Sequence, residues 1–439
     1  MMKVTRRVFA LIAASLAFSA TAEAAAMKLS LEDALKMAHD RNTSIKAAKA
    51  RIDQADAMIV QSRQAYLPKI QLSETFTHTN DPGANLVFKL QQEIANPQTD
   101  FAPGALNHPP AINDFHTSLQ VMQPLINVDA MIGRSVATSA KRAQEFMSER
   151  AVETIDLNIK KAYYGLIMAR KNVAALEQSI GIMKGYSAEA AKAFKVGLLT
   201  KSDKLSTDVR LAELNEQKLM MQNEMRNAED ALRTMLKLEA DDTIVPTGDL
   251  IVDGASSAAK SLPAGRSDLK ALEAFNDVSG YQHDMAKAQS LPRLNAFAQQ
   301  NWHDASLLGT EGSSWVVGLN MQWNIFDGMA TKGKVQEAKA KQLEARYNYE
   351  AAKEQSVMEV NRAKRAMQTS RQRVEVARKS LDEARVSLDF IGEQFRTGMA
   401  MTFELLMREQ SFTWAKLRIN QAKYDYCVAK SELEYYGGR

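Results

Sequence analysis

Cysteine is almost absent from this sequence, since Cys427 is its only occurrence among 439 residues. A single thiol cannot form a disulfide within one chain, so the fold must be held by other contacts. The chain also lacks a large excess of either charge, because 56 lysine and arginine residues balance 52 aspartate and glutamate residues and leave a formal net charge of +4. So small a net charge gives no electrostatic reason to expect a nucleic-acid partner.

Long apolar runs are also missing. No run of 18 apolar residues follows the N-terminal segment, so the sequence predicts no transmembrane helix. Residues 1–26 combine basic Lys3, Arg6 and Arg7 with a short apolar stretch and small residues that suit cleavage, which is typical of an export signal. We expect the remaining chain to be exported, and an exported chain of this kind can still enter an outer membrane as a β-barrel.

The sequence also lacks motifs that are typical of catalytic or metal-binding sites. The six histidines show neither an HExxH motif nor another ligand spacing, and no Ser/His/Asp or Cys/His arrangement stands out. Gly328, Gly333 and Lys334 resemble a phosphate-binding loop, but Val335 follows where that loop needs a Ser or Thr hydroxyl for Mg²⁺. We therefore predict no enzyme activity and no cofactor, and expect the two glycines to ease a turn from strand into helix.

Proline is missing from two long tracts, residues 125–245 and 293–439, although the chain contains ten prolines. Because proline breaks a helix interior, these tracts allow very long helices. Apolar residues follow a spacing of three and four along both tracts, which predicts coiled-coil packing. The helix expected over residues 129–195 would extend roughly 100 Å, about three times the hydrocarbon thickness of a bilayer. Such helices are expected to be struts in an aqueous space, not membrane spans.

The same spacing predicts which side chains share the helix seams. In the last helix it places Leu405, Arg408 and Phe412 on one face. An arginine on this seam is an exception to an otherwise apolar pattern.

The two halves of the sequence carry the same segments in the same order, which indicates an internal repeat. The corresponding pairs are YLPKIQLSETF at 66–76 with SLPRLNAFAQQ at 290–300, LQVMQPLIN at 119–127 with LNMQWNIFD at 319–327, and FKVGLLTKSDKL at 194–205 with FRTGMAMTFELL at 395–406.

Each copy predicts a helix, a strand, a loop, a second strand, a long helix, a short break and another long helix. We assign residues 27–239 to the first repeat, 240–265 to a linker and 266–439 to the second repeat. The extra length of the first copy falls in residues 80–114, which are rich in Pro, Asn and Asp and are expected to form a loop.

The four strand segments alternate apolar and polar side chains. Trp315, Leu319 and Trp323 share the apolar face of the last segment and are expected to face lipid. The pattern also suits a half-buried sheet of a soluble protein, but the export signal favours a membrane barrel. Four strands cannot close a conducting barrel, so several chains must contribute.

These features together resemble the outer membrane efflux protein family, the TolC-like channels. The resemblance covers nearly the whole mature chain and is carried by LSLEDALKMAHDRN, the two LP[KR][IL] motifs, RSDLKALE and the paired F-x-x-G breaks. It implies a trimer with one twelve-stranded outer-membrane β-barrel, four strands from each chain, continued by a long antiparallel α-helical coiled-coil tunnel through the periplasm. It also implies the outer membrane of a Gram-negative bacterium as the location.

Partners and function follow from the same resemblance. It implies a periplasmic membrane-fusion adaptor and an inner-membrane pump of the RND, ABC or MFS type, acting in tripartite efflux or type I secretion. The chain would then be a passive exit duct in contact with outer-membrane lipid.

The resemblance also assigns functional positions. Asp203, Glu404 and Met407 would lie at the periplasmic entrance, where Met407 replaces the second acid of the family motif and Ala400 stands where some members carry a basic residue. A local role is equally open for Glu404, because an acid at a helix N-terminus is favoured by the helix dipole.

Other positions follow from the helix breaks and the strand motifs. The adaptor is expected to contact the breaks at Gly197, Leu198, Thr200, Gly398 and Met399. The strands of the barrel are expected to begin at Pro68, Pro124 and Pro292.

A second class of function stays open, namely a periplasmic adaptor or coiled-coil scaffold without a pore. Such a protein needs one helical hairpin and a separate β-rich module. This sequence predicts two hairpins and two pairs of strands, which favours the duct.

Overall fold

The computed structural model describes residues 27–239, 243–253 and 265–438. Most of these residues are helical, which confirms the predicted mainly helical architecture. The chain divides into two compact units, each built from segments of both halves of the sequence. We call residues 1–47, 149–266 and 355–439 the helical unit, and residues 48–148 and 267–354 the sheet unit. The predicted export signal, residues 1–26, lies outside the described residues.

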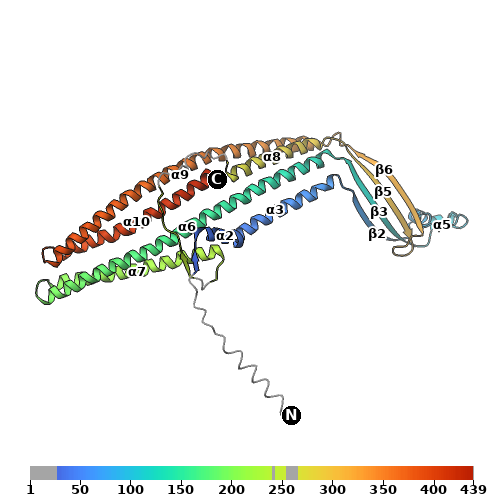
Figure 1. The fold of residues 1–439 in the computed structure, drawn as a ribbon. Coiled ribbons are helices and arrows are strands. Elements are labelled where there is room, and N and C mark those ends of the chain that lie inside the picture. The colour runs from blue at the N-terminus through green and yellow to red at the C-terminus, as the bar shows by residue number, and fades with distance from the viewer. Residues whose placement is uncertain (1–26, 240–242, 254–264, 439) are drawn as a thin grey trace, which may run out of the picture. The chain divides into compact units, whose positions relative to one another are not determined.

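Two very long helices, α6 (Val128–Lys195) and α9 (Ala330–Arg396), contribute to both units (Figure 1). The other elements of the helical unit are β1 (Met27–Leu29), α2 (Leu31–Arg41), the start of α3 (Thr43–Ser62), α7 (Lys201–Leu236), β4 (Ile244–Pro246) and α10 (Thr402–Gly437). The sheet unit contains the rest of α3, the short helix η1 (Arg63–Ala65), β2 (Lys69–Thr79), α4 (Pro82–Gln91), α5 (Pro103–Asn107), β3 (Ile112–Ile126), α8 (Ser267–Ala288), β5 (Arg293–Asp304) and β6 (Gly312–Gln322).

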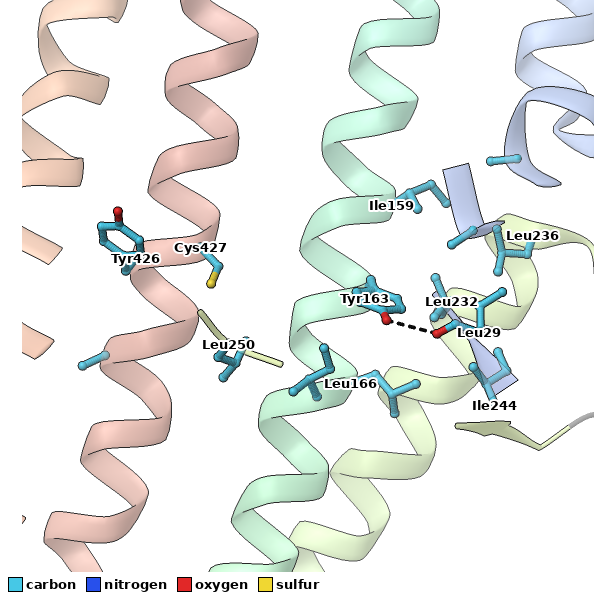
Figure 2. Packing of buried hydrophobic residues seen from close by; sticks show 14 of the residues in the cluster. Leu29, Ile159, Tyr163, Leu166, Leu232, Leu236, Ile244, Leu250, Tyr426 and Cys427 are labelled. Atoms are coloured by element: carbon cyan, nitrogen blue, oxygen red, sulfur yellow. Dashed lines mark hydrogen bonds between the residues drawn. The ribbon is translucent and has the colours of Figure 1, made fainter. Parts of the chain in front are cut away.

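The helical unit has a continuous apolar core where β1 and β4 pair in parallel beside α6, α7 and α10. Figure 2 shows Leu29, Tyr163, Leu232 and Ile244 converging there, with the Tyr163 hydroxyl donating to the Leu29 carbonyl oxygen at 3.0 Å. Burying a Leu or Ile side chain stabilises a fold by about 1.5–3 kcal/mol, so this cluster is a principal source of stability in the unit.

Cys427 belongs to the same core (Figure 2). Burial raises the pKa of its thiol to about 11, so the group stays protonated and inert near neutral pH. Cys427 therefore acts as a small packing residue of this core.

The sheet unit is organised by an antiparallel four-stranded sheet in the order β2-β3-β5-β6. Its register runs unbroken along β2 and β6 and is irregular only between Pro124 and Ile126 of β3. Pro124 therefore lies near the end of β3, where the ladder is already disturbed, and not at the beginning of a strand as predicted. Pro68 and Pro292 do directly precede β2 and β5.

Two other expectations need correction. Residues 80–114 are not a plain loop, because Asp81 caps α4 by accepting from the Ala84 N–H at 2.8 Å and Pro82 supplies a preset first turn. α5 and the start of β3 also fall in this range. Trp323 lies one residue beyond β6, which ends at Gln322.

The turn before α9 needs only one of its two glycines. Gly328 has a positive φ of 67°, a conformation that favours glycine, whereas Gly333 lies inside α9, where an added Cβ would meet no other atom. Asp327 accepts from the Thr331 N–H at 2.9 Å and so caps the helix, while Lys334 contacts the side chain of Gln289 at 3.4 Å. The segment is a capped turn, and its lysine contacts the turn that follows α8 (Ser267–Ala288).

Candidate functional site

The two faces of the four-stranded sheet differ in chemistry. Large side chains on one face are exposed, with values of 73% for Trp315, 67% for Leu319 and 64% for Leu72. The register places these with Ile70, Phe76, Phe115, Val121, Val317 and Met321. The opposite face carries Gln71, Ser73, Thr75, His116, Ser118, Gln120, Asn295, Gln299, Asn301, Ser314 and Asn320. An exposed apolar patch of this extent marks a surface that contacts lipid or protein.

Two tryptophans bracket the apolar face along β6. Trp315 and Trp323 are eight residues apart, which corresponds to about 26 Å of extended chain. Outer-membrane strands carry an apolar band about 25 Å tall with aromatic side chains at its borders. Trp323 is 54% exposed, and its indole N–H donates to the Ser290 carbonyl oxygen at 3.0 Å, which fixes the ring at the helix end of the strand.

Polar groups on the apolar face gather toward its other end. Glu74 accepts from the Thr117 hydroxyl and, at 3.4 Å, from the Leu308 N–H of the β5–β6 connection. Asp304 accepts from the Ser306 N–H at 2.8 Å in the same connection. The β5–β6 connection therefore folds toward the apolar face.

The edges of the sheet are open. Among the described residues, β2 and β6 each pair with only one strand, which leaves one side of each backbone without ladder hydrogen bonds. Long open edges are unusual in a stable protein, because they invite pairing with another chain.

The helix breaks of the two repeats have the same backbone geometry. Gly197 follows α6 with a φ of 79°, and Gly398 follows α9 with a φ of 77°. The next residues, Leu198 and Met399, donate their N–H groups back to carbonyl oxygens five residues earlier, at 2.9 and 2.8 Å. Both breaks are thus Schellman motifs, in which glycine is favoured at the left-handed position.

These breaks leave apolar side chains in solvent. In a Schellman motif the residue after the glycine usually packs against the helix it ends. Here Leu198 is 78% exposed and Met399 is 74% exposed. Val196, Met401 and Phe403 are also strongly exposed. The two tips therefore present apolar side chains that the described residues of the chain do not cover.

Both predicted entrance acids take part in helix caps. Asp203 forms a capping box with Thr200, whose hydroxyl donates to the carboxylate at 2.6 Å while the Asp203 N–H donates to the Thr200 hydroxyl at 3.1 Å. These hydrogen bonds from Thr200 lower the pKa of Asp203. Glu404 accepts from the Met401 N–H at 3.1 Å at the start of α10. The local role left open for Glu404 therefore has a structural basis.

Met407 lies in a different environment from the two acids. It lines an open groove of about 430 Å³ between α7 and α10, with Leu205 and Val209 of α7 and Phe403 of α10. Thr200, as noted, caps α7, and Ala400 is buried beneath the second break.

A buried ion pair near the breaks was not predicted from the sequence. Arg210 Nε of α7 donates to Glu409 Oε2 of α10 at 2.7 Å, and the Glu409 side chain is fully buried. The Thr413 hydroxyl donates to Glu409 Oε1 at 2.6 Å and lies 2.7 Å from Ser179 Oγ of α6. The seam prediction was wrong by one position, because Arg408 is exposed and Glu409 is buried.

Within the part of the chain that the structure describes, no group of three or more His, Cys, Asp or Glu side chains is arranged to hold a metal ion. None of the described helices has an apolar stretch long enough to cross a bilayer.

Comparisons with known proteins agree with this geometry. The model of the family described as outer membrane efflux protein matches residues 34–236 and 259–439. Outer membrane protein TolC of Vibrio cholerae is 19% identical over 416 residues, covering 92% of this chain and 89% of that protein. Outer membrane efflux protein BepC of Brucella suis is 20% identical over 444 residues, covering 98% of this chain and 90% of that protein.

Solved structures share the fold. The outer membrane protein VceC from Vibrio cholerae superimposes with a TM-score of 0.78 at 17% identity, covering 93% of this chain and 96% of that one. The Campylobacter jejuni CmeC outer membrane channel gives a TM-score of 0.79 at 19% identity, covering 93% of this chain and 85% of that one.

Proposed function

Because the chain belongs to the outer membrane efflux protein family, we propose that it forms the passive exit duct of a tripartite efflux pump or a type I secretion system. The protein is an outer membrane efflux protein of the TolC-like group. The proposal adds the assembly, the partners and the direction of transport. The observation that carries it is the sheet with one exposed apolar face, one polar face and two open edges.

Strand direction allows copies of the sheet to join. β2 runs away from the helices and β6 runs back toward them, so β6 of one chain pairs antiparallel with β2 of the next. Strand directions then alternate around the closed ring, and every edge strand pairs with a neighbour through backbone hydrogen bonds. The apolar faces turn to lipid, with Trp315, Leu319 and Trp323 at the surface, and the polar faces line the interior.

Barrel size favours three copies. Two sheets would give a barrel of about eight strands, whose interior is just filled by side chains. Three sheets give about twelve strands and leave a passage. Cyclic trimers are a common closed symmetry for identical chains. We therefore propose a homotrimer, with the long helices of α6, α7, α9 and α10 forming its periplasmic part.

The helix breaks are the proposed periplasmic entrance and adaptor contact. Gly197, Leu198 and Thr200 in one repeat, with Gly398 and Met399 in the other, form tips with exposed apolar side chains, and exposed methionine suits an adaptable protein contact. Around a three-fold axis, Asp203 and Glu404 would give rings of carboxylates that attract cations. The adaptor and an inner-membrane pump of the RND, ABC or MFS type would supply substrate and energy.

The test of the duct is reconstitution. Purified protein is expected to require detergent, to have the mass of three chains, and to give discrete current steps in a planar phospholipid bilayer. A protein that stays in the soluble periplasmic fraction as a single chain would instead support the alternative of an adaptor or scaffold without a pore.

The entrance is tested separately in the same bilayers. Glu404→Gln is expected to weaken the block of the channel by added divalent cations, with Glu375→Gln, an exposed acid far along α9, as the control. If added divalent cations block both variants and the native protein equally, Glu404 does not lie at the entrance.

A further inference from the structure

The connection between β2 and β3 carries a helix that lies against the polar face of the sheet. The end of α4 crosses β6 at Gly312, where an added Cβ would lie only 1.8 Å from the carbonyl oxygen of Gln91. Gly312 pairs with His303, so this approach is on the polar face. Any residue with a side chain at position 312 would push α4 off the sheet.

A buried polar network holds α4 at this place. Gln92, 2% exposed, donates through Nε2 to the Asn113 carbonyl oxygen at 2.8 Å and to Asp114 Oδ1 at 2.9 Å. Asp114, 1% exposed, contacts His303 Nδ1 at 3.0 Å. His303 in turn stacks on His116 with ring centroids 4.2 Å apart.

This network fixes the end of α4 on the polar face of the sheet. Buried polar groups are costly to leave without partners, so these hydrogen bonds resist separation of α4 from the sheet. Three elements, α4, β3 and β5, share the bonds, so α4 is a fixed part of the sheet unit.

The other side of α4 is apolar and uncovered. Val87, Leu90 and Ile94 are 48%, 52% and 51% exposed. Val87 and Leu90, three residues apart, lie on one face of α4, and buried Asn85 and the C-cap residue Gln92 lie on the opposite side, while Ile94 follows the end of the helix after Glu93, whose φ is 59°. The apolar stripe therefore faces away from the sheet on which α4 sits.

We propose, on the premise that three sheets close into a barrel around their polar faces, that α4 is an internal collar at the end of the duct farthest from the helices. The three copies of α4 sit inside the wall, and their Val87, Leu90 and Ile94 side chains meet around the axis. The stripe is thus covered by the same segment of the other two chains.

The dimensions agree with this arrangement. Twelve strands spaced about 4.8 Å apart and tilted by about 40° give a barrel roughly 24 Å across between backbones. α4 lies across the strands, and a helix with side chains is about 10 Å thick, so three copies lining a wall of about 12 Å radius reach most of the way to the axis. The collar consequently takes up most of the cross-section.

Function follows from the chemistry of the stripe. A narrow apolar ring loses water readily and so resists the passage of hydrated ions, while apolar solutes pass. The collar is a second constriction, independent of the entrance at the helix breaks, and it opposes entry of hydrophilic molecules from outside.

Conductance provides the first test. The triple variant Val87→Ser, Leu90→Ser and Ile94→Ser replaces only exposed side chains and should raise single-channel conductance about twofold or more. Leu307→Ser is the control, because Leu307 is 67% exposed in the β5–β6 connection, which folds toward the apolar face. Equal conductance of the triple variant and the native protein, with the native protein conducting, would overturn the collar and leave the duct intact.

Crosslinking provides a second test if the triple variant fails to insert. In a Cys427→Ser background, Leu90→Cys should form disulfide-linked dimers on oxidation, whereas Leu307→Cys should not. Absence of dimers from Leu90→Cys trimers that conduct would overturn the collar alone. A native protein that neither forms trimers nor conducts would overturn the duct and the collar together.

Discussion

Arg210 and Glu409 form an ion pair at 2.7 Å in the interior of the helical unit, where α7 of the first repeat faces α10 of the second. Removing one charge of a buried pair leaves the other uncompensated and typically costs 3–5 kcal/mol, whereas replacing both by apolar groups can be neutral. The pair therefore joins the two hairpins in a way that tolerates double but not single replacement.

The first prediction follows directly. Glu409→Leu should lower the free energy of unfolding by about 3 kcal/mol or more, and Arg210→Met with Glu409→Leu should recover most of that loss. Denaturant unfolding in detergent, followed by helical circular dichroism, measures both. Arg385→Ala, which breaks an exposed pair with Asp389 at 3.9 Å, should change stability by less than about 0.5 kcal/mol. A loss of equal size in the single and double variants would contradict the prediction.

The second prediction concerns the first helix break and pH. Thr200→Ala removes the cap of α7 and should destabilise the protein by about 1 kcal/mol. Because the folded pKa of Asp203 is lowered, its contribution is complete above the ordinary value of 3.8 and is lost as the pH falls through the lower folded pKa. Thermal unfolding between about pH 2 and 6 should show this loss in the native protein. An unchanged acid profile in Asp203→Asn would count against the cap.

The third prediction concerns close packing of α9 on α6. A Cβ at Gly392 would lie 2.1 Å from the Tyr186 hydroxyl, and Tyr186 is itself packed edge-on against Phe395. Gly392→Ala should therefore cost about 1–3 kcal/mol, although alanine is the better helix former. Adding Tyr186→Phe should recover part of the loss.

Gly185 is the matched control for that helix contact. It lies in α6 with no atom near its would-be Cβ, so Gly185→Ala should stabilise the protein by about 0.5–1 kcal/mol. Stabilisation by both alanines would mean that helix propensity, not the contact with Tyr186, governs these sites.

The fourth prediction separates the two faces of the sheet. Leu319→Lys places a charge on the proposed lipid face and should cost about 2–4 kcal/mol, while Asn320→Lys, the next residue on the polar face, should cost far less. The yield of folded trimers in outer membranes and their resistance to heat in detergent measure the difference. Equal tolerance of both lysines would refute a lipid contact at Leu319.

Much of the fold was predictable because its elements are long and strongly periodic. The helix predicted over residues 129–195 differs by one residue from α6, and strand alternation identified the exposed apolar face with Trp315 and Leu319. The glycines at both breaks do adopt the positive φ that their position after a helix suggests.

Other features could not be read from periodicity. α4 was hidden in a segment rich in turn-forming residues, although Asp81 followed by Pro82 was a usable start signal. Between buried Leu405 and Phe412 of α10, a spacing of three and four residues allows either position 408 or position 409 to face inward, and the structure buries Glu409. Arg210, the partner of Glu409, lies in the other half of the sequence, so no local sequence pattern indicated the pair.

The open edges of β2 and β6 have a consequence for biogenesis. Before it pairs with other copies, a newly exported chain has two strand edges without ladder hydrogen bonds beside an exposed apolar face. The open edges of such a chain tend to pair with other extended polypeptides. In the proposed ring the neighbouring chains pair these edges, so the yield of rings is expected to rise with the concentration of newly exported chains.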